Sequence, residues 1–116
     1  VAADAVVTVA RPTLKEIEGI PQMLQLVADV AEAYRPSLRL AAVVPCDVPA
    51  SGRLYAEGVE LLEHHYPDLV TPSVRRTIKV PEAHAEATPV PLWVPNEPVT
   101  ADYRRVLEWL TGRGVL

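Results

Sequence analysis

The sequence predicts an α/β protein in which helices cover both faces of a mostly parallel sheet, giving three layers. Two observations carry this prediction. Short apolar runs rich in valine alternate with longer segments that repeat apolar residues every three or four positions, and these patterns are typical of buried strands and amphipathic helices. The order strand, helix, strand, helix, strand, irregular segment, helix fits a doubly wound sheet, because parallel strands need helical crossovers.

Three segments are predicted as strands. Residues 5–10, AVVTVA, form a nearly continuous apolar run, which indicates a strand covered on both faces. Residues 37–45, SLRLAAVVP, share this character, and residues 68–74, DLVTPSV, are predicted as a third strand that Pro72 cuts short. The loops after Ala10, Val44 and Val70 should share one rim, where ligands of such sheets gather.

The first helix is predicted to begin at TLKE, residues 13–16, as a capping box between Thr13 and Glu16. Pro21 removes a backbone donor from the following run, so a kink is expected at Gly19–Pro21. The residues predicted to face the sheet are Ile17, Ile20, Leu24, Val27, Val30 or Ala31, and Tyr34.

Two further helices are predicted, at residues 53–66 and near residues 100–111. The first should place Tyr55, Val59, Leu62 and Tyr66 on one face. The last should bury Tyr103, Val106, Leu107 and Leu110 and end at Gly112. The proline-rich stretch between the third strand and the last helix is predicted to be irregular and stiff.

Length and composition limit the classes of protein to which the chain can belong. Residues 1–116 are about the size of one domain, but three strands would leave bare sheet edges, and the start on Val1 suggests a partial domain. Eleven basic and fifteen acidic residues give a net charge of -4, so nothing global favours nucleic acid or an anionic membrane. A single cysteine, Cys46, predicts a reducing, cytoplasmic setting, and no apolar run is long enough to span a membrane.

The order of several segments resembles the carboxyl-terminal half of ParA/MinD-type ATPases, with the ParA branch favoured. These segments are VVTVARPT, LRLAAVV, SGRLYAEGVELL, TPSVRRTIKVPEA and PVPLWVPNEPVTADYRRVLEWL. The strongest likeness lies in residues 72–83, where a strand ends at a proline, basic residues follow, and the pair Glu82–Ala83 comes next. The resemblance implies the carboxyl-terminal half of a P-loop NTPase fold. Members of this family form ATP-sandwich dimers and position DNA or other cargo.

The resemblance also implies where a nucleotide base would lie. It places the adenine against two strand-end turns, through apolar stacking and backbone hydrogen bonds, and the stiff segment would pass along the base. The residues concerned are Pro45, Cys46, Asp47, Pro72, Ser73 and Val74. The competing interpretation is that these are ordinary turns. Ala87–Thr88 stands where the family usually has glycine.

Four basic residues resemble in position those that ParA proteins use for sequence-independent DNA contact. They are Arg53, Arg75, Arg76 and Lys79. Each neutralised phosphate would add affinity and salt dependence. The alternative is a solvated basic face.

The phosphate chemistry of the family is absent from this sequence. No Gly-x-x-x-x-Gly-Lys occurs, and such a loop is needed to hold the phosphates of ATP and, with an acidic residue, Mg²⁺. The chain alone is therefore expected to bind neither ATP nor Mg²⁺ and to be inactive. The expected partners are a complementing amino-terminal half or a second copy, non-specific DNA and a ParB-like activator, and no membrane.

Other reactive residues carry weaker hypotheses. His64 and His65 are adjacent, and neighbours on a helix point about 100° apart, so no metal site is predicted. Cys46 is expected to be a half-buried structural thiol. Trp93 and Trp109 are expected in the core or an interface. The alternative function for the whole chain is a non-catalytic α/β module that binds a protein partner without nucleotide.

Overall fold

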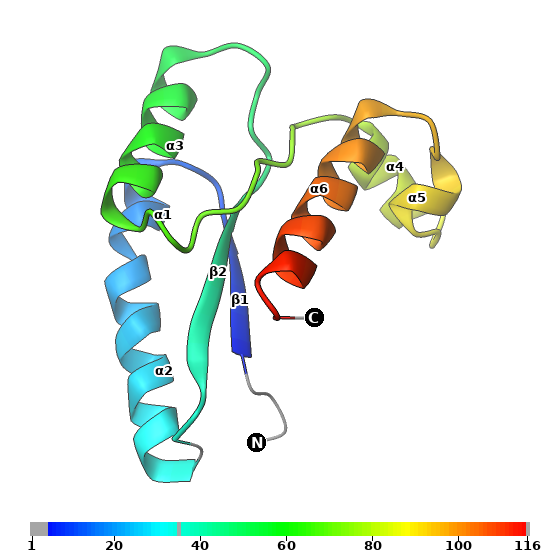
Figure 1. The fold of residues 1–116 in the computed structure, drawn as a ribbon. Helices are drawn as coiled ribbons and strands as arrows, with labels where there is room; N and C mark the ends of the chain where they lie inside the picture. Colours follow the sequence, from blue (N-terminus) through cyan, green and yellow to red (C-terminus); the bar gives the residue numbers. More distant parts are fainter. Residues whose placement is uncertain (1–4, 35, 116) are drawn as a thin grey trace.

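The computed structural model describes residues 5–34 and 36–115 as an α/β fold with a small parallel sheet (Figure 1). The elements are β1 (Ala5–Ala10), α1 (Leu14–Glu18), α2 (Ile20–Tyr34), β2 (Arg39–Pro45), α3 (Arg53–His65), α4 (Lys79–Ala85), α5 (Val90–Trp93) and α6 (Pro98–Gly112). The two strands are parallel, and their register runs from Ala5 opposite Arg39 to Ala10 opposite Pro45. The predicted α/β class and the first two predicted strands are confirmed.

The predicted third strand is wrong as a regular strand. Residues 69–76 run parallel to β2 and pair with the chain only at two isolated bridges, Val43 with Val70 and Val48 with Arg75. Between these bridges lie Pro45 and Pro72, which carry no amide hydrogen, so the ladder cannot continue. The segment still places β2 between β1 and residues 69–76.

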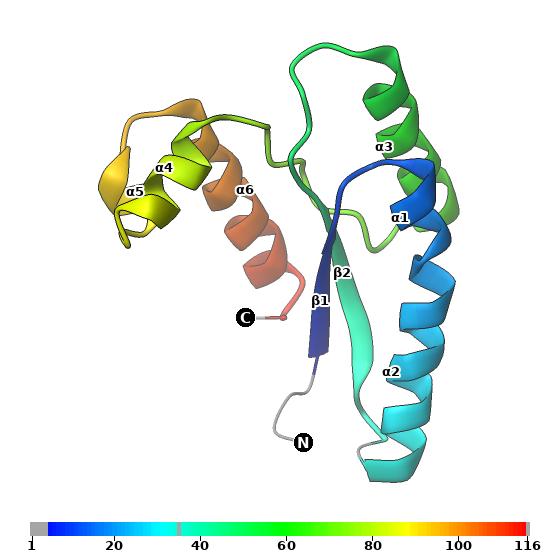
Figure 2. The same cartoon turned by 180° about the vertical axis from the view of Figure 1, so that it is seen from behind.

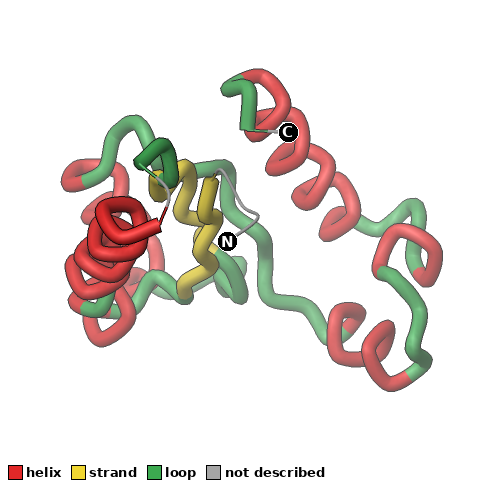
Figure 3. Tube along the Cα trace, turned by 90° about the horizontal axis from the view of Figure 1, so that it is seen from below, coloured by secondary structure: helices red, strands yellow, loops and turns green. Residues whose placement is uncertain are grey.

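Helices lie on both sides of the strands (Figure 3). One side is covered by α1, α2 and α3 over a core of Ala10, Ile17, Ile20, Val27, Leu38, Leu40, Val43 and Leu62. The other side is covered by α6 over a second core of Ala42, Val44, Val74, Val99, Val106 and Leu110. Because side chains alternate along a strand, β2 contributes to both cores.

β1 is covered on one face only, so the prediction that both faces are buried is wrong. Val6 packs against the first core, whereas Val7 and Val9, on the opposite face, are 40% and 64% exposed. The reason is the placement of α6, whose core includes β2 residues but, within the described part of the chain, none from β1. Seen from behind, β1 is also the free edge of the sheet (Figure 2).

The first helical segment has the predicted kink but not the predicted capping box. Helix α1 ends at Glu18 and α2 begins at Ile20, so the break falls at Gly19. Thr13 is the N-cap but makes no side-chain cap hydrogen bond. Instead, the Glu16 carboxylate accepts from the backbone N–H and the Nε of Arg11 at 3.3 and 3.1 Å. Tyr34, predicted to face the sheet, is exposed.

Helix α3 packs closely on the turn that precedes α1. Leu62 is fully buried, as predicted, and Tyr55, Val59 and Tyr66 are partly buried. Gly58 is buried too, and a Cβ there would lie 1.9 Å from the carbonyl oxygen of Pro12. Glycine is therefore what allows this close approach.

The carboxyl-terminal region departs most from prediction. The stretch predicted as irregular contains two short helices, α4 and α5, and α6 begins at Pro98. Helix α6 buries Val106 and Leu110 as predicted, but Tyr103 and Leu107 are exposed. Their places in the packed face are taken by Val99, Thr100 and Asp102. A buried carboxylate cannot be read from an apolar pattern.

No helix in residues 5–34 and 36–115 combines the length and apolar character needed to cross a membrane.

Candidate functional site

The carboxyl ends of the strands meet at one rim, as predicted. The backbone N–H of Cys46 donates to the carbonyl of Ala10 at 3.0 Å and so ties the end of β2 to the end of β1. On the other side, Val74 N–H donates to the Pro45 carbonyl at 2.8 Å. Arg76 N–H donates to the Val48 carbonyl, also at 2.8 Å. The turn after β2 and the segment 72–76 are therefore one hydrogen-bonded unit.

Five of the six predicted base-side residues line cavities at this rim. A cavity of about 430 Å³, cavity A, is lined by Val48, Pro49, Ala50, Pro72, Ser73, Arg75, Arg76, Asp102 and Arg105. A second cavity of about 260 Å³, cavity B, is lined by Cys46, Asp47, Val74, Arg75, Thr77, Val80, Pro81 and Tyr103. The predicted residues are thus divided between two neighbouring cavities, while Pro45 is fully buried at the end of β2.

Arg75 lines both cavities and is held by Asp102 of α6. The carboxylate Oδ2 accepts from the Arg75 Nε at 2.6 Å and from its backbone N–H at 3.1 Å. Oδ1 accepts from the Arg75 Nη2 at 3.0 Å and from the Nη2 of Arg105. Burial alone would raise the pKa of the Asp102 carboxyl, but the hydrogen bonds from Arg75 and the charges of Arg75 and Arg105 outweigh it and lower that pKa.

Sequence reasoning missed Asp102. An aspartate in the first turns of a helix is usually solvated, and no spacing links it to Arg75, 27 residues earlier. The signal that existed was the position of Asp102 between the buried residues Val99 and Val106 on one helical face.

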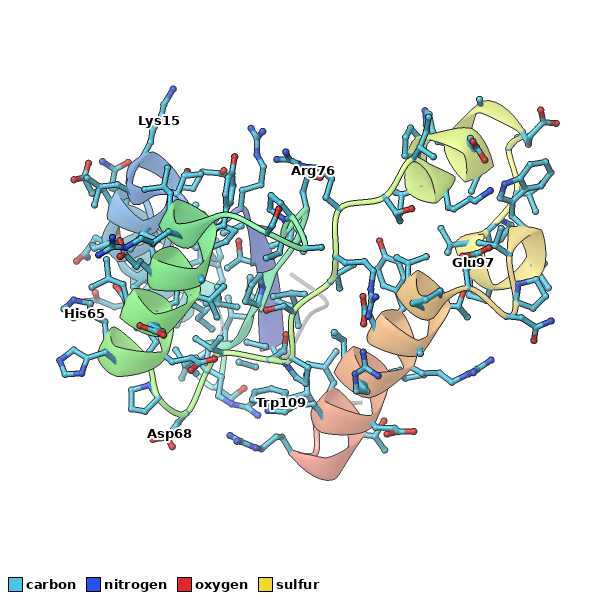
Figure 4. All side chains as sticks on the ribbon, turned by 90° about the horizontal axis from the view of Figure 1, so that it is seen from above. Lys15, His65, Asp68, Arg76, Glu97 and Trp109 are labelled. Carbon is cyan, nitrogen blue, oxygen red and sulfur yellow. The ribbon has the colours of Figure 1, made fainter. Side chains whose placement is uncertain are left out.

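Arg76 is paired with Asp47 across the rim. Its Nε and Nη2 donate to the Asp47 carboxylate at 3.1 and 3.3 Å, and its guanidinium lies 5.3 Å from the centre of the Tyr55 ring. In Figure 4, Arg76 lies on the segment that leads from the sheet to α4. Asp47 itself has a positive φ of 54°, a conformation that aspartate tolerates better than most residues.

The other two basic residues also have acidic partners. The Arg53 Nε lies 2.7 Å from a Glu57 oxygen, and the Lys79 Nζ lies 3.7 Å from a Glu82 oxygen. The four residues predicted to contact DNA are therefore each paired with a carboxylate. They do not form one unpaired basic surface.

Cys46 is half-buried, as expected for a structural thiol. Burial raises its pKa, and the nearby carboxylates of Glu16 and Asp47 raise it further, against a lowering by Arg11. The thiolate is therefore disfavoured, and reactivity as a nucleophile with it. Burial likewise raises the pKa of Tyr103, on the wall of cavity B.

The remaining hypotheses concern metals and tryptophans. Within residues 5–34 and 36–115 no three His, Cys, Asp or Glu side chains lie close enough together to hold a metal ion. Trp109 (Figure 4) packs against the second core, as its apolar context predicted. The Arg113 guanidinium lies 4.2 Å from the centre of its ring. Trp93 is exposed and does not lie in a core.

Comparison with known proteins bears on the fold. No model of a known protein family matches the chain. It is similar to the uncharacterized protein MJECL24 of Methanocaldococcus jannaschii, with 26% identity over 112 residues, covering 95% of this chain and 43% of that protein.

Two solved structures of Cyanothece McdA are also similar. The apo form matches with a TM-score of 0.78 and 17% identity over 94% of this chain and 45% of the McdA chain. An aspartate-to-alanine variant in complex with ATP matches with a TM-score of 0.77 and 16% identity over 95% and 44%. The chain therefore spans less than half the length of these proteins. The predicted resemblance to part of a ParA/MinD-type domain is confirmed in the fold.

Proposed function

We propose that the chain is the carboxyl-terminal part of a ParA-like ATPase domain and supplies the base side of a nucleotide pocket and part of a dimer surface. In such a protein, ATP-dependent dimerisation would position DNA or other cargo. The observation that carries the proposal is the match in fold to McdA, which has been solved both without nucleotide and, as a variant, with ATP.

The openness of the chain supports its role as part of a larger domain. Its radius of gyration is 15.2 Å, against roughly 13 Å for a compact domain of this length. It exposes 7472 Å² of surface, against roughly 6,200 Å² for a folded monomer of this mass. The free edge of β1 and the exposed Val7 and Val9 mark where further structure would pack.

The rim supports the assignment of a base rather than of phosphates. Cavity B has apolar walls formed by Val74, Val80 and Pro81, with the ring of Tyr103 beside them, and such a surface suits a flat heterocycle. Cavity A combines apolar residues with three arginines and Asp102. A phosphate-binding glycine loop does not occur in the sequence. ATP and Mg²⁺ would therefore be held only together with a complementing amino-terminal half that supplies such a loop.

The experiment is nucleotide binding by the native gene product that contains this chain, measured by calorimetry with Mg²⁺. We expect ATP to bind, and Ser73→Tyr, which fills cavity A, to weaken ATP binding about tenfold or more. Ser37→Tyr is the matched control, because Ser37 is exposed at the opposite end of β2. Absence of ATP binding by the wild type would refute the proposal and favour the non-catalytic interaction module.

Non-specific DNA binding is the further part of this proposal, and Arg53, Arg76 and Lys79 are the residues that test it. Phosphates would have to displace their carboxylate partners, so binding should be weak, steeply salt-dependent and dependent on pairing of two subunits. Arg75 is unsuitable for this test because it holds Asp102. Charge reversal of Arg53, Arg76 and Lys79 should abolish gel shifts of the ATP-bound dimer. Unchanged shifts would place any DNA surface elsewhere.

A further inference from the structure

The buried carboxylate of Asp102 connects α6 to the rim, because it accepts hydrogen bonds from Arg75. Asp102 is 2% exposed and accepts four hydrogen bonds, three of them from Arg75 and one from Arg105. Arg75 belongs to the segment 72–76, whose other side is fixed to the turn after β2 by the backbone hydrogen bonds of Val74 and Arg76. The segment is therefore held between α6 and β2.

Within residues 5–34 and 36–115, the hydrogen bonds of the Arg75 side chain all go to Asp102. This side chain is 46% exposed and lies between cavity A and cavity B, so it forms a wall of each. A long side chain released from its partner regains rotamer freedom and can turn into either space. The backbone hydrogen bonds of residues 74 and 76 would remain, so the path of the chain could persist while the wall moved.

Stability alone does not account for a buried carboxylate at this place. Apolar residues of similar volume often give equal or greater stability than a buried ion pair. The fork of a guanidinium on a carboxylate, in contrast, fixes both groups in direction as well as in distance. This geometry is suited to holding a side chain at a binding surface.

We propose that Asp102 is a positioning residue of the base-side site, which fixes Arg75 as the wall between the two cavities. This inference rests on the proposed function, since it concerns the same site. Its consequence is that recognition of the base, and not of the phosphates, depends on a carboxylate of α6 that acts by fixing the Arg75 guanidinium.

The test uses the native gene product and two substitutions on α6. Asp102→Asn keeps the shape of the side chain and removes its charge, and Glu108→Gln makes the same chemical change at an exposed position of the helix. Binding of ATP, GTP and inorganic tripolyphosphate is measured by calorimetry with Mg²⁺, and thermal unfolding is followed alongside.

We expect Asp102→Asn to weaken ATP binding about tenfold, to reduce the preference between ATP and GTP, and to leave tripolyphosphate binding unchanged. Glu108→Gln should match the wild type. A purely structural Asp102 would lower all three affinities together and leave the ATP-to-GTP ratio intact, whatever the change in unfolding temperature, and that result would overturn the inference.

A second variant keeps the test decisive if Asp102→Asn does not fold. Arg75→Lys retains the cation and the backbone hydrogen bond but cannot form the two-pronged contact, and it should cause the same loss of base preference. Should the wild type fail to bind ATP, the proposed function falls and this inference with it. Should Ser73→Tyr weaken ATP binding while neither Asp102→Asn nor Arg75→Lys alters base preference, only this inference falls.

Discussion

Two individual residues adopt environments that their chemistry ordinarily disfavours, and both can be tested. Ala87 follows α4 with a φ of +50°, in the left-handed region. Asp102 is an ionised group beneath the surface, and its pKa is lowered.

Replacing Ala87 with glycine should stabilise the protein. Left-handed backbone costs a residue with a Cβ roughly 1–2 kcal/mol, and the greater freedom of glycine in the unfolded chain offsets roughly 0.4–1 kcal/mol of that gain. We expect a net increase of about 1 kcal/mol in the free energy of unfolding, measured by chemical denaturation. Ala56→Gly, at an exposed helical position of α3, should lower it by about 1 kcal/mol. Equal effects at both sites would contradict the strain at Ala87.

Asp102 should make stability depend on pH below the ordinary carboxyl range. Its folded pKa lies below the unfolded value of 3.8, so the unfolded chain takes up the proton first as pH falls. The stabilisation is therefore present above about pH 4 and is lost as pH falls from 3.8 through the folded pKa.

The measurement is the unfolding free energy of wild type and Asp102→Asn between pH 2 and 7. We expect the difference between the two proteins to be largest above about pH 4 and to shrink in acid. Glu108→Gln serves as the control for loss of any carboxylate from α6. A difference that stayed constant across this pH range would show that the charge of Asp102 is not what stabilises the fold.

At the scale of helices and strands, α3 approaches the turn before α1 most closely at Gly58, where there is no room for a side chain. Gly58→Ala would force a Cβ to within 1.9 Å of the Pro12 carbonyl oxygen, so the two segments must separate. We expect a loss of about 3 kcal/mol in the free energy of unfolding. Gly112→Ala, with no atom near its added Cβ, should be neutral or slightly stabilising. A Gly58→Ala protein of wild-type stability would mean that α3 moves freely against α1.

The limits of a helix or strand could be predicted from the sequence where that element carries a clear apolar pattern. The strands at residues 5–10 and 39–45 were predicted from nearly continuous apolar runs, and the helix at residues 53–65 from its apolar period, each close to its observed limits. The kink at Gly19 followed from Pro21. The third strand was not predicted correctly because Pro45 of β2 has no N–H to donate to the neighbouring segment, and the pairing resumes only at Val48 and Arg75. This interruption depends on the register of two distant segments, which neither segment shows alone.

The site was less predictable than the fold. The parallel-sheet topology located the rim, but ion pairs between residues distant in the sequence fix the charged groups that lie there. Arg75, which the resemblance assigns to DNA contact, is held by Asp102, which follows it by 27 residues. Arg76 and Asp47, 29 residues apart, are joined in the same way. No local pattern encodes such pairs.

The molecule as a whole presents an incomplete surface, and this should be visible in solution. Val7 and Val9 lie exposed beside the free edge of β1, and an uncovered apolar strand edge favours association. We expect the 116-residue chain, prepared alone, to self-associate in sedimentation velocity. Val9→Lys should shift it toward the monomer, because a charge at a strand edge opposes pairing.

Leu92→Lys is the matched control, since Leu92 is similarly exposed but lies on α5, away from the strand edge. Association lost equally in both variants would show a general effect of charge. A cooperative and stable monomer would contradict the view that the chain needs a partner half.

The position of β2 between the two cores implies an uneven distribution of opening motions. Ala42 and Val43 are fully buried on opposite faces of this strand, and its amides bond to β1 and to residues 69–76, so they can exchange only when the packed strands separate. Hydrogen–deuterium exchange in β2 should therefore be the slowest in the chain and follow global unfolding, whereas α5, which buries no residue, should exchange through local fluctuations. On heating, α5 should therefore unfold first and β2 last.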